Sequence, residues 1–340
     1  MQHLITGGSG FLGSLIADEL LKKGEKVRIL DVIDDPDRPK EIEFIHGSVC
    51  DEETVKRAMR NVNIVHHNAA LVPLTKSGKE FWNVNVLGSE CVARAAIKEG
   101  ADAFIHMSSS SIYGAPKDII TNRTLPNPIE IYGSSKLAAE KKIQSIFANT
   151  SIHLNIIRPR CILGKSRLGI FKILFDWIND NKNIYIIGSG NNPLQFVHAK
   201  DLMDFYMLTL SNEIDGTFNV GTPYYQPLRL ELETLINYAN KNSKVISLPP
   251  LLAVSSLKIL DYAKLSPLSP FHYLTYGKPY HFDTKPLTDL GWNPKYSNQE
   301  MIQESYDSFL ENKDSLNLNQ KSVHRRPVKE KILWLLKKLS

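Results

Sequence analysis

Tyr132 and Lys136 are the residues of this chain whose types and spacing best suit a proton-transfer reaction. Side chains four residues apart on a helix lie on the same face. A lysine ammonium beside a tyrosine favours the phenolate, so the tyrosine can exchange a proton with an alcohol or a carbonyl near neutral pH. The pair alone also fits an ordinary surface helix. Ser109, in a serine cluster 23 residues before Tyr132, favours the catalytic interpretation.

A glycine-rich turn near the start of the chain predicts a dinucleotide site. It lies between residues 4–6, which fit a short buried strand, and residues 14–21, which fit an amphipathic helix. Gly7 permits the tight turn, Gly10 lets the backbone approach a pyrophosphate, and Gly13 lets the helix pack closely on the strand. The N-terminus of the helix then offers N–H groups and a partial positive charge to the phosphates.

Asp31 predicts which dinucleotide binds. It ends the next expected strand, residues 27–31, and lies 18 residues after Gly13. A carboxylate there can accept hydrogen bonds from the adenosine ribose hydroxyls and repels a 2′-phosphate. No arginine or lysine follows until Arg38, so the sequence predicts NAD rather than NADP.

Composition excludes several other classes of protein. The 340 residues, 42% of them hydrophobic, are enough for one large core or two unequal lobes. The three cysteines have neither metal-ligand spacing nor a disulfide framework, so we expect no metal site and a reducing, cytoplasmic location. We also expect no signal peptide and no membrane span. Residues 321–340 contain seven Lys or Arg and one Glu, a net +6 against a total of +5, so the body of the protein is not basic and nucleic-acid binding is not expected.

Strands alternate with helical patterns over the first 160 residues, which predicts an α/β protein with a doubly wound parallel sheet. A looser pattern with proline-rich stretches follows, and it favours a smaller mixed lobe over the carboxyl ends of the strands. We expect a nucleotide-binding domain at 1–160 with returning segments near 195–222, a substrate lobe mainly at 161–311, a polar linker at 312–327 and a basic tail at 328–340. Further strands are expected at 42–46, 62–67, 103–107 and 152–157, and further helices at 52–60, 79–99 and 132–147.

The tail at 328–340 has a helical pattern of its own. Its apolar residues fall on one face and its lysines on the other; they are Val328, Ile332, Leu335, Leu336 and Leu339. Two interpretations stay open. Such a helix can dock on its own domain, or it can make a weak contact with a membrane surface or a partner.

The chain resembles the extended short-chain dehydrogenase/reductases, specifically their NAD-dependent epimerase/dehydratase branch, over roughly residues 1–311. The motifs that carry the resemblance are Thr6 to Gly13, Asp31, Gly47 to Asp51, Asn68-Ala69-Ala70, Asn85 to Gly88, Ser108 to Gly114, Tyr132 to Lys136, Phe196 to Leu202, Phe218 to Gly221 and Leu290 to Pro294. The resemblance implies a Rossmann-type doubly wound sheet, a smaller C-terminal substrate lobe, a bound NAD and hydride transfer at a secondary alcohol or ketone. A homodimer is a further expectation.

The resemblance also implies roles for individual residues. Ser109 would hydrogen-bond the reacting oxygen, Tyr132 would act as acid and base, and Lys136 would hold the nicotinamide ribose and lower the pKa of the tyrosine. The residues expected to bind the cofactor are Gly7, Ser9, Gly10, Phe11, Leu12, Gly13, Asp31, Ser48, Val49, Asn68, Ala69, Ala70, Asn85, Tyr132, Lys136 and Pro159. For Asn85 a purely structural contact within a helix stays an equal alternative. His66, His67 and His198 are expected to be structural.

The substrate is where the sequence departs from the family pattern. Members that are 4,6-dehydratases carry an Asp-Glu pair where this chain has Ser110 and Ser111, so we do not expect that elimination. Members that are nucleotide-sugar 4-epimerases carry an asparagine and two arginines that would grip a diphosphate. Those positions are Cys161, Leu194 and Thr275, although cations at Arg158, Arg160, Lys165 and Arg167 can compensate.

Three functions therefore stay open. The first is epimerisation of a sugar-like substrate with retained NAD, as in a nucleotide-sugar 4-epimerase. The second is net oxidation or reduction of a lipid-like alcohol by an enzyme similar to the 3-beta-hydroxysteroid dehydrogenases. The third is NAD sensing without turnover, which the presence of Ser109, Tyr132 and Lys136 disfavours.

Overall fold

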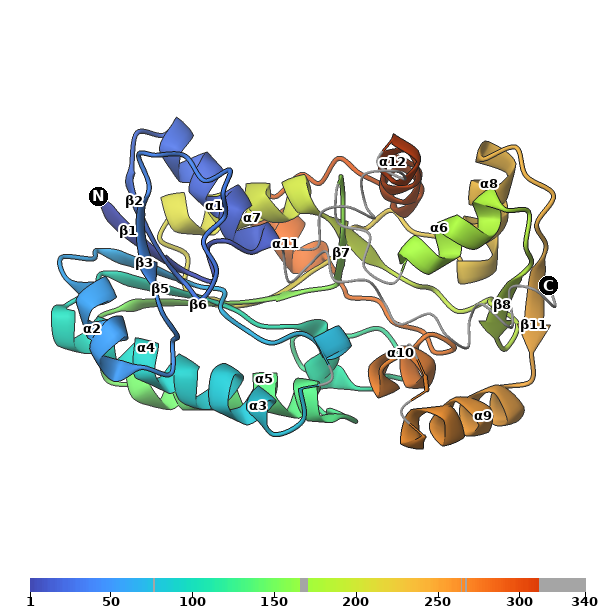
Figure 1. Ribbon diagram of the computed structural model, residues 1–340, viewed down its shortest axis with the longest axis horizontal. Coiled ribbons are helices and arrows are strands. Elements are labelled where there is room, and N and C mark those ends of the chain that lie inside the picture. The colour runs from blue at the N-terminus through green and yellow to red at the C-terminus, as the bar shows by residue number, and fades with distance from the viewer. Residues whose placement is uncertain (76, 166–170, 264, 267, 312–340) are drawn as a thin grey trace. The chain divides into compact units, whose positions relative to one another are not determined.

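The computed structural model describes residues 1–75, 77–165, 171–263, 265–266 and 268–311 (Figure 1). They form two compact units. The first unit contains residues 1–112, 131–159 and 203–218, and the second contains 113–130, 160–202 and 219 onward. Residues 113–130, which lie inside the range expected for the nucleotide-binding domain, thus group with the second unit. The linker and tail expected at 312–340 lie outside the described residues.

The first unit is built on a seven-stranded sheet in the order β10-β6-β5-β4-β1-β2-β3, paired in parallel from β3 to β6. This confirms the expected α/β class and doubly wound sheet. The chain turns from one half of the sheet to the other between β1 and β4, and sheets of this kind bind ligands at the carboxyl ends of the strands there. The strands are β1 (Gln2–Thr6), β2 (Lys26–Asp31), β3 (Glu43–His46), β4 (Ile64–His67), β5 (Ala103–Met107), β6 (His153–Pro159) and β10 (Gly216–Val220).

Helices cover both faces of this sheet because successive strand residues point to opposite faces. On one face Leu4, Leu30, Val65 and Phe104 form a single buried cluster with apolar residues of three helices. These helices lie side by side under the sheet in Figure 1; they are α2 (Glu52–Met59), α4 (Ser89–Glu99) and α5 (Ile131–Phe147). Helix α1 (Phe11–Lys22) lies on the other face, near α7 (Ala199–Ser211).

The long helix expected at 79–99 is not uniform. It consists of α3 (Glu80–Trp82), a π-helical turn (Asn83–Gly88) and then α4. A π turn adds one residue to the helical repeat, and such turns are frequent at functional sites. Here it contains Asn85, which is fully buried.

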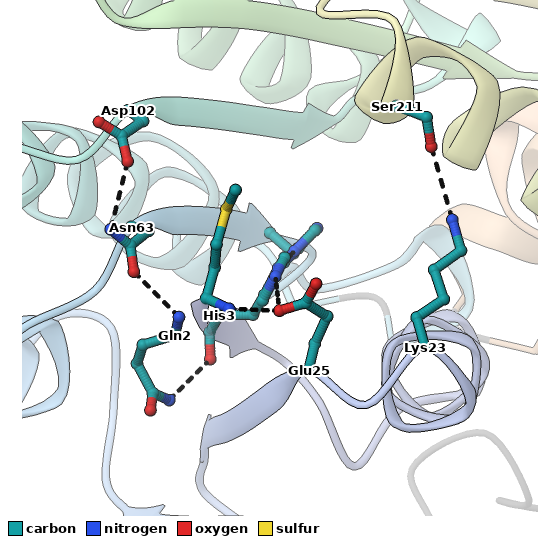
Figure 2. Close-up of polar contacts among 9 residues, drawn as sticks. Gln2, His3, Lys23, Glu25, Asn63, Asp102 and Ser211 are labelled. Carbon is teal, nitrogen blue, oxygen red and sulfur yellow. Dashed lines mark hydrogen bonds and ion pairs between the residues drawn. The ribbon is translucent and has the colours of Figure 1, made fainter.

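Polar side chains fix the amino-terminal ends of the central strands, as Figure 2 shows. The side-chain oxygen of Asn63 accepts a hydrogen bond from the Gln2 amide at 3.0 Å, and its amide group donates to Asp102 at 3.2 Å. Asn63 precedes β4, so one side chain joins three neighbouring strands. Lys23, directly after α1, also donates to Ser211 at the end of α7 at 3.5 Å.

The second unit contains two small parallel sheets, β7 with β9 and β8 with β11. Its strands are β7 (Cys161–Leu163), β8 (Ile184–Ile187), β9 (Phe196–His198) and β11 (Val245–Leu248). Its helices include α6 (Phe171–Asn179), α8 (Leu228–Tyr238), α9 (Pro250–Tyr262), α10 (Pro270–Thr275), α11 (Lys285–Asp289) and α12 (Asn298–Glu311). No helix in the described ranges is both long and apolar enough to cross a membrane.

Two motifs of the second unit meet at the buried Asp201. Its carboxylate accepts hydrogen bonds from the backbone amides of Lys295 and Tyr296, both at 3.0 Å. Its carbonyl accepts one from the Trp292 indole at 2.9 Å. The segments Phe196 to Leu202 and Leu290 to Pro294 therefore hold each other in place. His198 of the first segment stacks on Tyr296 with ring centroids 3.7 Å apart and contacts Glu304 at 2.7 Å, which is a structural role.

Candidate active site

The glycine turn after β1 is a cradle that a larger side chain would fill. Gly7 has a φ of +69° and its amide donates to the Leu30 carbonyl at 2.9 Å. A Cβ on Gly7 would come within 2.8 Å of the Ala69 backbone, and one on Gly13 within 2.3 Å of the Gly7 carbonyl. Only glycine combines this backbone conformation with so close an approach. The turn thus has the shape that a pyrophosphate requires.

Unsatisfied polar atoms beside the turn also fit a phosphate or ribose ligand. The Ser9 hydroxyl and the Asn68 side-chain oxygen are buried without a hydrogen-bond partner among the described residues. Buried polar groups are ordinarily paired. Gly10 is the N-cap of α1, so no side chain caps this helix, and its N-terminus suits an anion. Phe11 and Leu12 form the first turn of α1. These residues fit an NAD pyrophosphate.

Asp31 faces the same turn. Its carboxylate accepts hydrogen bonds from the Ser9 amide at 3.1 Å and the Ile33 amide at 3.2 Å. Burial raises the pKa of this carboxyl above its usual value, while the backbone hydrogen bonds oppose the shift. The carboxylate at the end of β2 is therefore held against the glycine turn.

Asp31 is expected to set the choice of cofactor, because its carboxylate can bond ribose hydroxyls and repels a 2′-phosphate. Binding titrations should show NAD(H) binding more tightly than NADP(H), and Asp31→Asn should narrow the gap. Asp102→Asn is a matched control, since Asp102 lies at the amino-terminal edge of the sheet (Figure 2). Equal affinity of the wild-type protein for both cofactors would refute the assignment.

The two loops expected at the cofactor follow β3 and β4. The Gly47 amide donates to the Asp31 carbonyl at 2.9 Å, so the first loop starts beside the acid. In this loop the Ser48 hydroxyl accepts a hydrogen bond from the Cys50 amide at 3.1 Å, and Val49 packs into the core. In the second loop, the Asn68 amide donates to the Thr6 carbonyl at 3.1 Å and the Ala69 amide to the Thr6 hydroxyl at 3.3 Å. Ala70 follows in this loop.

Asn85 ties the second loop to α5. Its side chain accepts a hydrogen bond from the Leu71 amide at 2.8 Å and donates to the Leu71 carbonyl at 3.3 Å and the Ser135 hydroxyl at 3.0 Å. Ser135 in turn donates to the Tyr132 carbonyl at 2.7 Å. If Asn85 is purely structural, its role is to position α5, the helix that carries Tyr132 and Lys136.

The candidate catalytic residues come from β5 and α5. Ser109 follows β5 closely, and its hydroxyl accepts hydrogen bonds from the Ser111 amide at 3.2 Å and hydroxyl at 3.0 Å. Tyr132 and Lys136 are buried one turn apart on α5, as the spacing predicts. The Lys136 ammonium donates to the Met107 carbonyl at the end of β5 at 2.6 Å. Burial lowers the pKa of Lys136 to about 8, and the charge of Glu140 opposes that shift. Pro159 ends β6, also buried.

His66 and His67, at the end of β4, make structural contacts. His66 bonds His3 at 2.9 Å and Tyr206 at 2.6 Å, and His67 bonds Thr6 at 2.7 Å and Ser89 at 2.8 Å. Both rings are fully buried. Their ring nitrogens bond side chains rather than the backbone. These contacts join β4 to β1, and to α7 and α4.

Arg158 and Arg160 are two of the cations that can replace the missing diphosphate-binding residues. Both already make contacts within their own units. Arg160 is buried over the Tyr280 ring at 3.9 Å and donates to the Gln195 carbonyl at 3.0 Å. Arg158 pairs with Glu140 at 2.6 Å. Lys165 is exposed, and Arg167 lies outside the described residues. Leu194 and Thr275 are buried. No group of three or more His, Cys, Asp or Glu suited to a metal ion occurs in the described part of the chain.

Comparison with known proteins gives relatives that match most of the chain. A protein of Sinorhizobium fredii, the uncharacterized y4nG, is 36% identical over 98% of this chain and 85% of its own length. The dTDP-D-glucose 4,6-dehydratase of Mus musculus is 27% identical over 96% of this chain and 93% of its own. The decarboxylating sterol-4-alpha-carboxylate 3-dehydrogenase of Mus musculus is 28% identical over 60% of this chain and 58% of its own.

Among solved structures, the UDP-glucose 4-epimerase of Thermus thermophilus in complex with NAD has the same fold. Its TM-score is 0.74 at 23% identity, over 91% of this chain and 99% of that one. The sequence model of the NAD dependent epimerase/dehydratase family matches residues 3–221. The resemblance seen in the motifs is therefore confirmed: this chain belongs to the NAD-dependent epimerase/dehydratase family of extended short-chain dehydrogenases/reductases, and its cofactor is NAD.

Proposed function

We propose that this enzyme moves hydride at a secondary alcohol or ketone of a sugar-like substrate, with Tyr132 as the acid and base. The observation that carries the proposal is the pair on α5, buried one turn apart, with the Lys136 ammonium held at the end of β5. When NAD is bound, its nicotinamide supplies the hydride chemistry. Tyr132 takes the hydroxyl proton as hydride leaves the carbinol carbon, and returns it in the reverse step. Ser109 hydrogen-bonds the reacting oxygen.

In this proposal the cofactor is held by the residues around the glycine turn. Gly7, Gly10, Gly13, Ser9 and the first turn of α1 hold the pyrophosphate, while Asp31 holds the adenosine ribose. Ser48 and Val49 lie by the adenine. The loop of Asn68, Ala69 and Ala70, together with Asn85, Lys136 and Pro159, borders the nicotinamide half.

A lipid-like alcohol is the second candidate substrate, and two observations favour it. Arg158 and Arg160 are engaged in contacts of their own, so neither compensates for the uncharged Leu194 and Thr275. A diphosphate needs charge-assisted donors. In addition, one relative of the chain is a sterol dehydrogenase.

The test is mass spectrometry of the purified protein under native conditions, followed by turnover assays. NAD retained through purification, with interconversion of C4-epimeric nucleotide sugars and no net NADH, supports the epimerase. An empty site together with NADH formation from 3β-hydroxysteroids supports the lipid alternative. If the protein binds NAD but turns over neither nucleotide sugars nor hydroxysteroids, the result contradicts both enzyme proposals. It then favours an NAD sensor without turnover.

We also propose a peripheral membrane contact through the tail at 328–339, which lies outside the described residues. The proposal rests on the sequence of the tail, with its basic residues and its apolar helical face. Separately, helix α9 has exposed apolar residues of its own. Leu251, Ile259 and Tyr262 share one side of this helix and are 79%, 69% and 93% exposed, next to Leu252 at 66%. Exposed apolar groups of this kind mark interaction surfaces. The cytoplasmic location and the homodimer expected from the sequence remain proposals.

Sedimentation with liposomes tests this contact. Basic residues contribute about 1 kcal/mol each at an anionic surface, so the full chain should co-sediment with anionic liposomes at low salt and not with neutral ones. A chain that ends at Gln320 should lose that binding and keep its activity. Full-length protein that ignores anionic liposomes contradicts the proposal. If the shortened chain unfolds, the tail instead belongs to the core.

A further inference from the structure

Glu140 is a buried carboxylate one turn after Lys136 on α5, and it is only 1% exposed. The Arg158 side chain grips it with two hydrogen bonds, from Nε at 2.9 Å and from Nη2 at 2.6 Å, one to each carboxylate oxygen. The Ser108 hydroxyl donates to the same carboxylate. Bidentate, charge-assisted bonds of this kind fix a carboxylate in one orientation.

The two residues that hydrogen-bond Glu140 come from the elements that form the candidate catalytic site. Ser108 follows Met107, whose carbonyl accepts the Lys136 hydrogen bond, and precedes Ser109. Arg158 lies in β6, the strand next to β5. The carboxylate of Glu140 thus links the end of β5, the end of β6 and the helix that carries Tyr132.

The charge of Glu140 also affects the protonation of Lys136. His67 on β4 and His106 on β5, both fully buried, are described titratable groups on which the charge of Lys136 acts, in addition to the neighbouring Tyr132. Burial, and then the charge of Lys136, lowers the pKa values of the two histidines far enough that they are neutral at pH 7. Glu140 is the described group whose charge favours the ammonium form of Lys136 against the cost of burial.

We propose that Glu140, held by Arg158 and Ser108, is a positioning residue that keeps the Lys136 ammonium charged and aimed at the end of β5 beside Tyr132. This inference rests on the proposed function, because it gives Lys136 and Tyr132 their catalytic roles. Glu140 itself touches neither the substrate nor the cofactor in this scheme. It acts through the lysine.

The test measures the ionisation of Tyr132 without a substrate. The phenolate absorbance of each protein is titrated with pH, and the curve of the same protein carrying Tyr132→Phe is subtracted. Glu140→Gln keeps the size and an acceptor oxygen of the side chain but removes its charge. The Tyr132 phenolate should then form at a pH about one unit higher than in the wild type, and NAD should bind several-fold more weakly. With Lys136→Met already present, Glu140→Gln should cause no further shift.

Asp201→Asn is the matched control, because Asp201 is a carboxylate of the same 1% exposure with a structural role in the second unit. It should lower stability and leave the Tyr132 titration unchanged. If Glu140→Gln does not fold because Arg158 is left unpaired, the double variant Glu140→Gln/Arg158→Met removes the whole pair and should show the same direction of shift.

A folded Glu140→Gln protein, or the folded double variant, with an unchanged Tyr132 titration overturns the inference. So does an equal shift in the Lys136→Met background, because the effect would then not pass through the lysine. Failure of the proposed function has a different signature, since a fully active Tyr132→Phe enzyme removes the catalytic role of the tyrosine whatever its titration shows.

Discussion

Tyr132→Phe is expected to lower turnover by about 10²–10⁴-fold and to leave NAD affinity within a few-fold of the wild-type value. In the proposed mechanism the phenol hydroxyl of Tyr132 exchanges the substrate proton. Phenylalanine removes that hydroxyl and keeps the ring that packs near Phe81, with centroids 5.9 Å apart. Steady-state kinetics with the substrate found by the assays above, together with NAD titration, measure the two effects separately.

Tyr206→Phe is the matched control for this prediction. Tyr206 is 1% exposed and its hydroxyl bonds His66 at 2.6 Å, so the substitution removes a buried hydroxyl of the same kind away from α5. It should lower the free energy of unfolding by about 1 kcal/mol and leave turnover nearly unchanged. A Tyr132→Phe enzyme with more than half of the wild-type activity would contradict the assignment.

Much of the first unit could be predicted from local patterns. The strand expected at 103–107 has those bounds in the structure, and the helix expected at 132–147 begins one residue earlier, at Ile131. Apolar runs, glycines and spacing within one helix are properties of short segments, so the glycine turn and the pair on α5 are visible in the sequence. The assignment of 113–130 to the second unit depends on packing between segments that are distant in the sequence, so it could not be predicted from local patterns.

The contacts that hold the candidate catalytic residues in place could not be predicted either, because they join segments that are distant in the sequence. Arg158 and Glu140 are 18 residues apart and meet only because β6 pairs with β5. The π turn at Asn85 also leaves no mark in the apolar pattern of 79–99. The histidines were expected to be structural, but their partners follow from the strand order, in which β1 and β4 lie side by side. His3 and His66 meet across those strands.

These buried histidines are expected to make the protein lose stability steeply in mild acid. Burial lowers the pKa of His3 to about 4 and that of His67 to about 3, and it holds the pKa values of His66 and His106 well below 6.5. In the unfolded chain each titrates near 6.5, so below that pH the unfolded state binds protons that the folded state does not. Their contribution is therefore fully present above about pH 6.5 and is lost as the pH falls toward 4.

The expected size of the loss at pH 5 is about 2 kcal/mol for each of His3 and His67, or about 4 kcal/mol for the two, against a typical total stability of about 5–15 kcal/mol. His66 and His106 add to this loss in the same direction. Urea unfolding at several pH values from 7.5 to 5 measures it. His106→Leu should reduce the slope by about one proton, because neither ring nitrogen of His106 has a hydrogen-bond partner among the described residues and the ring is fully buried. If stability stays level down to pH 5, these histidines are protonated in the folded protein and their burial does not oppose acid.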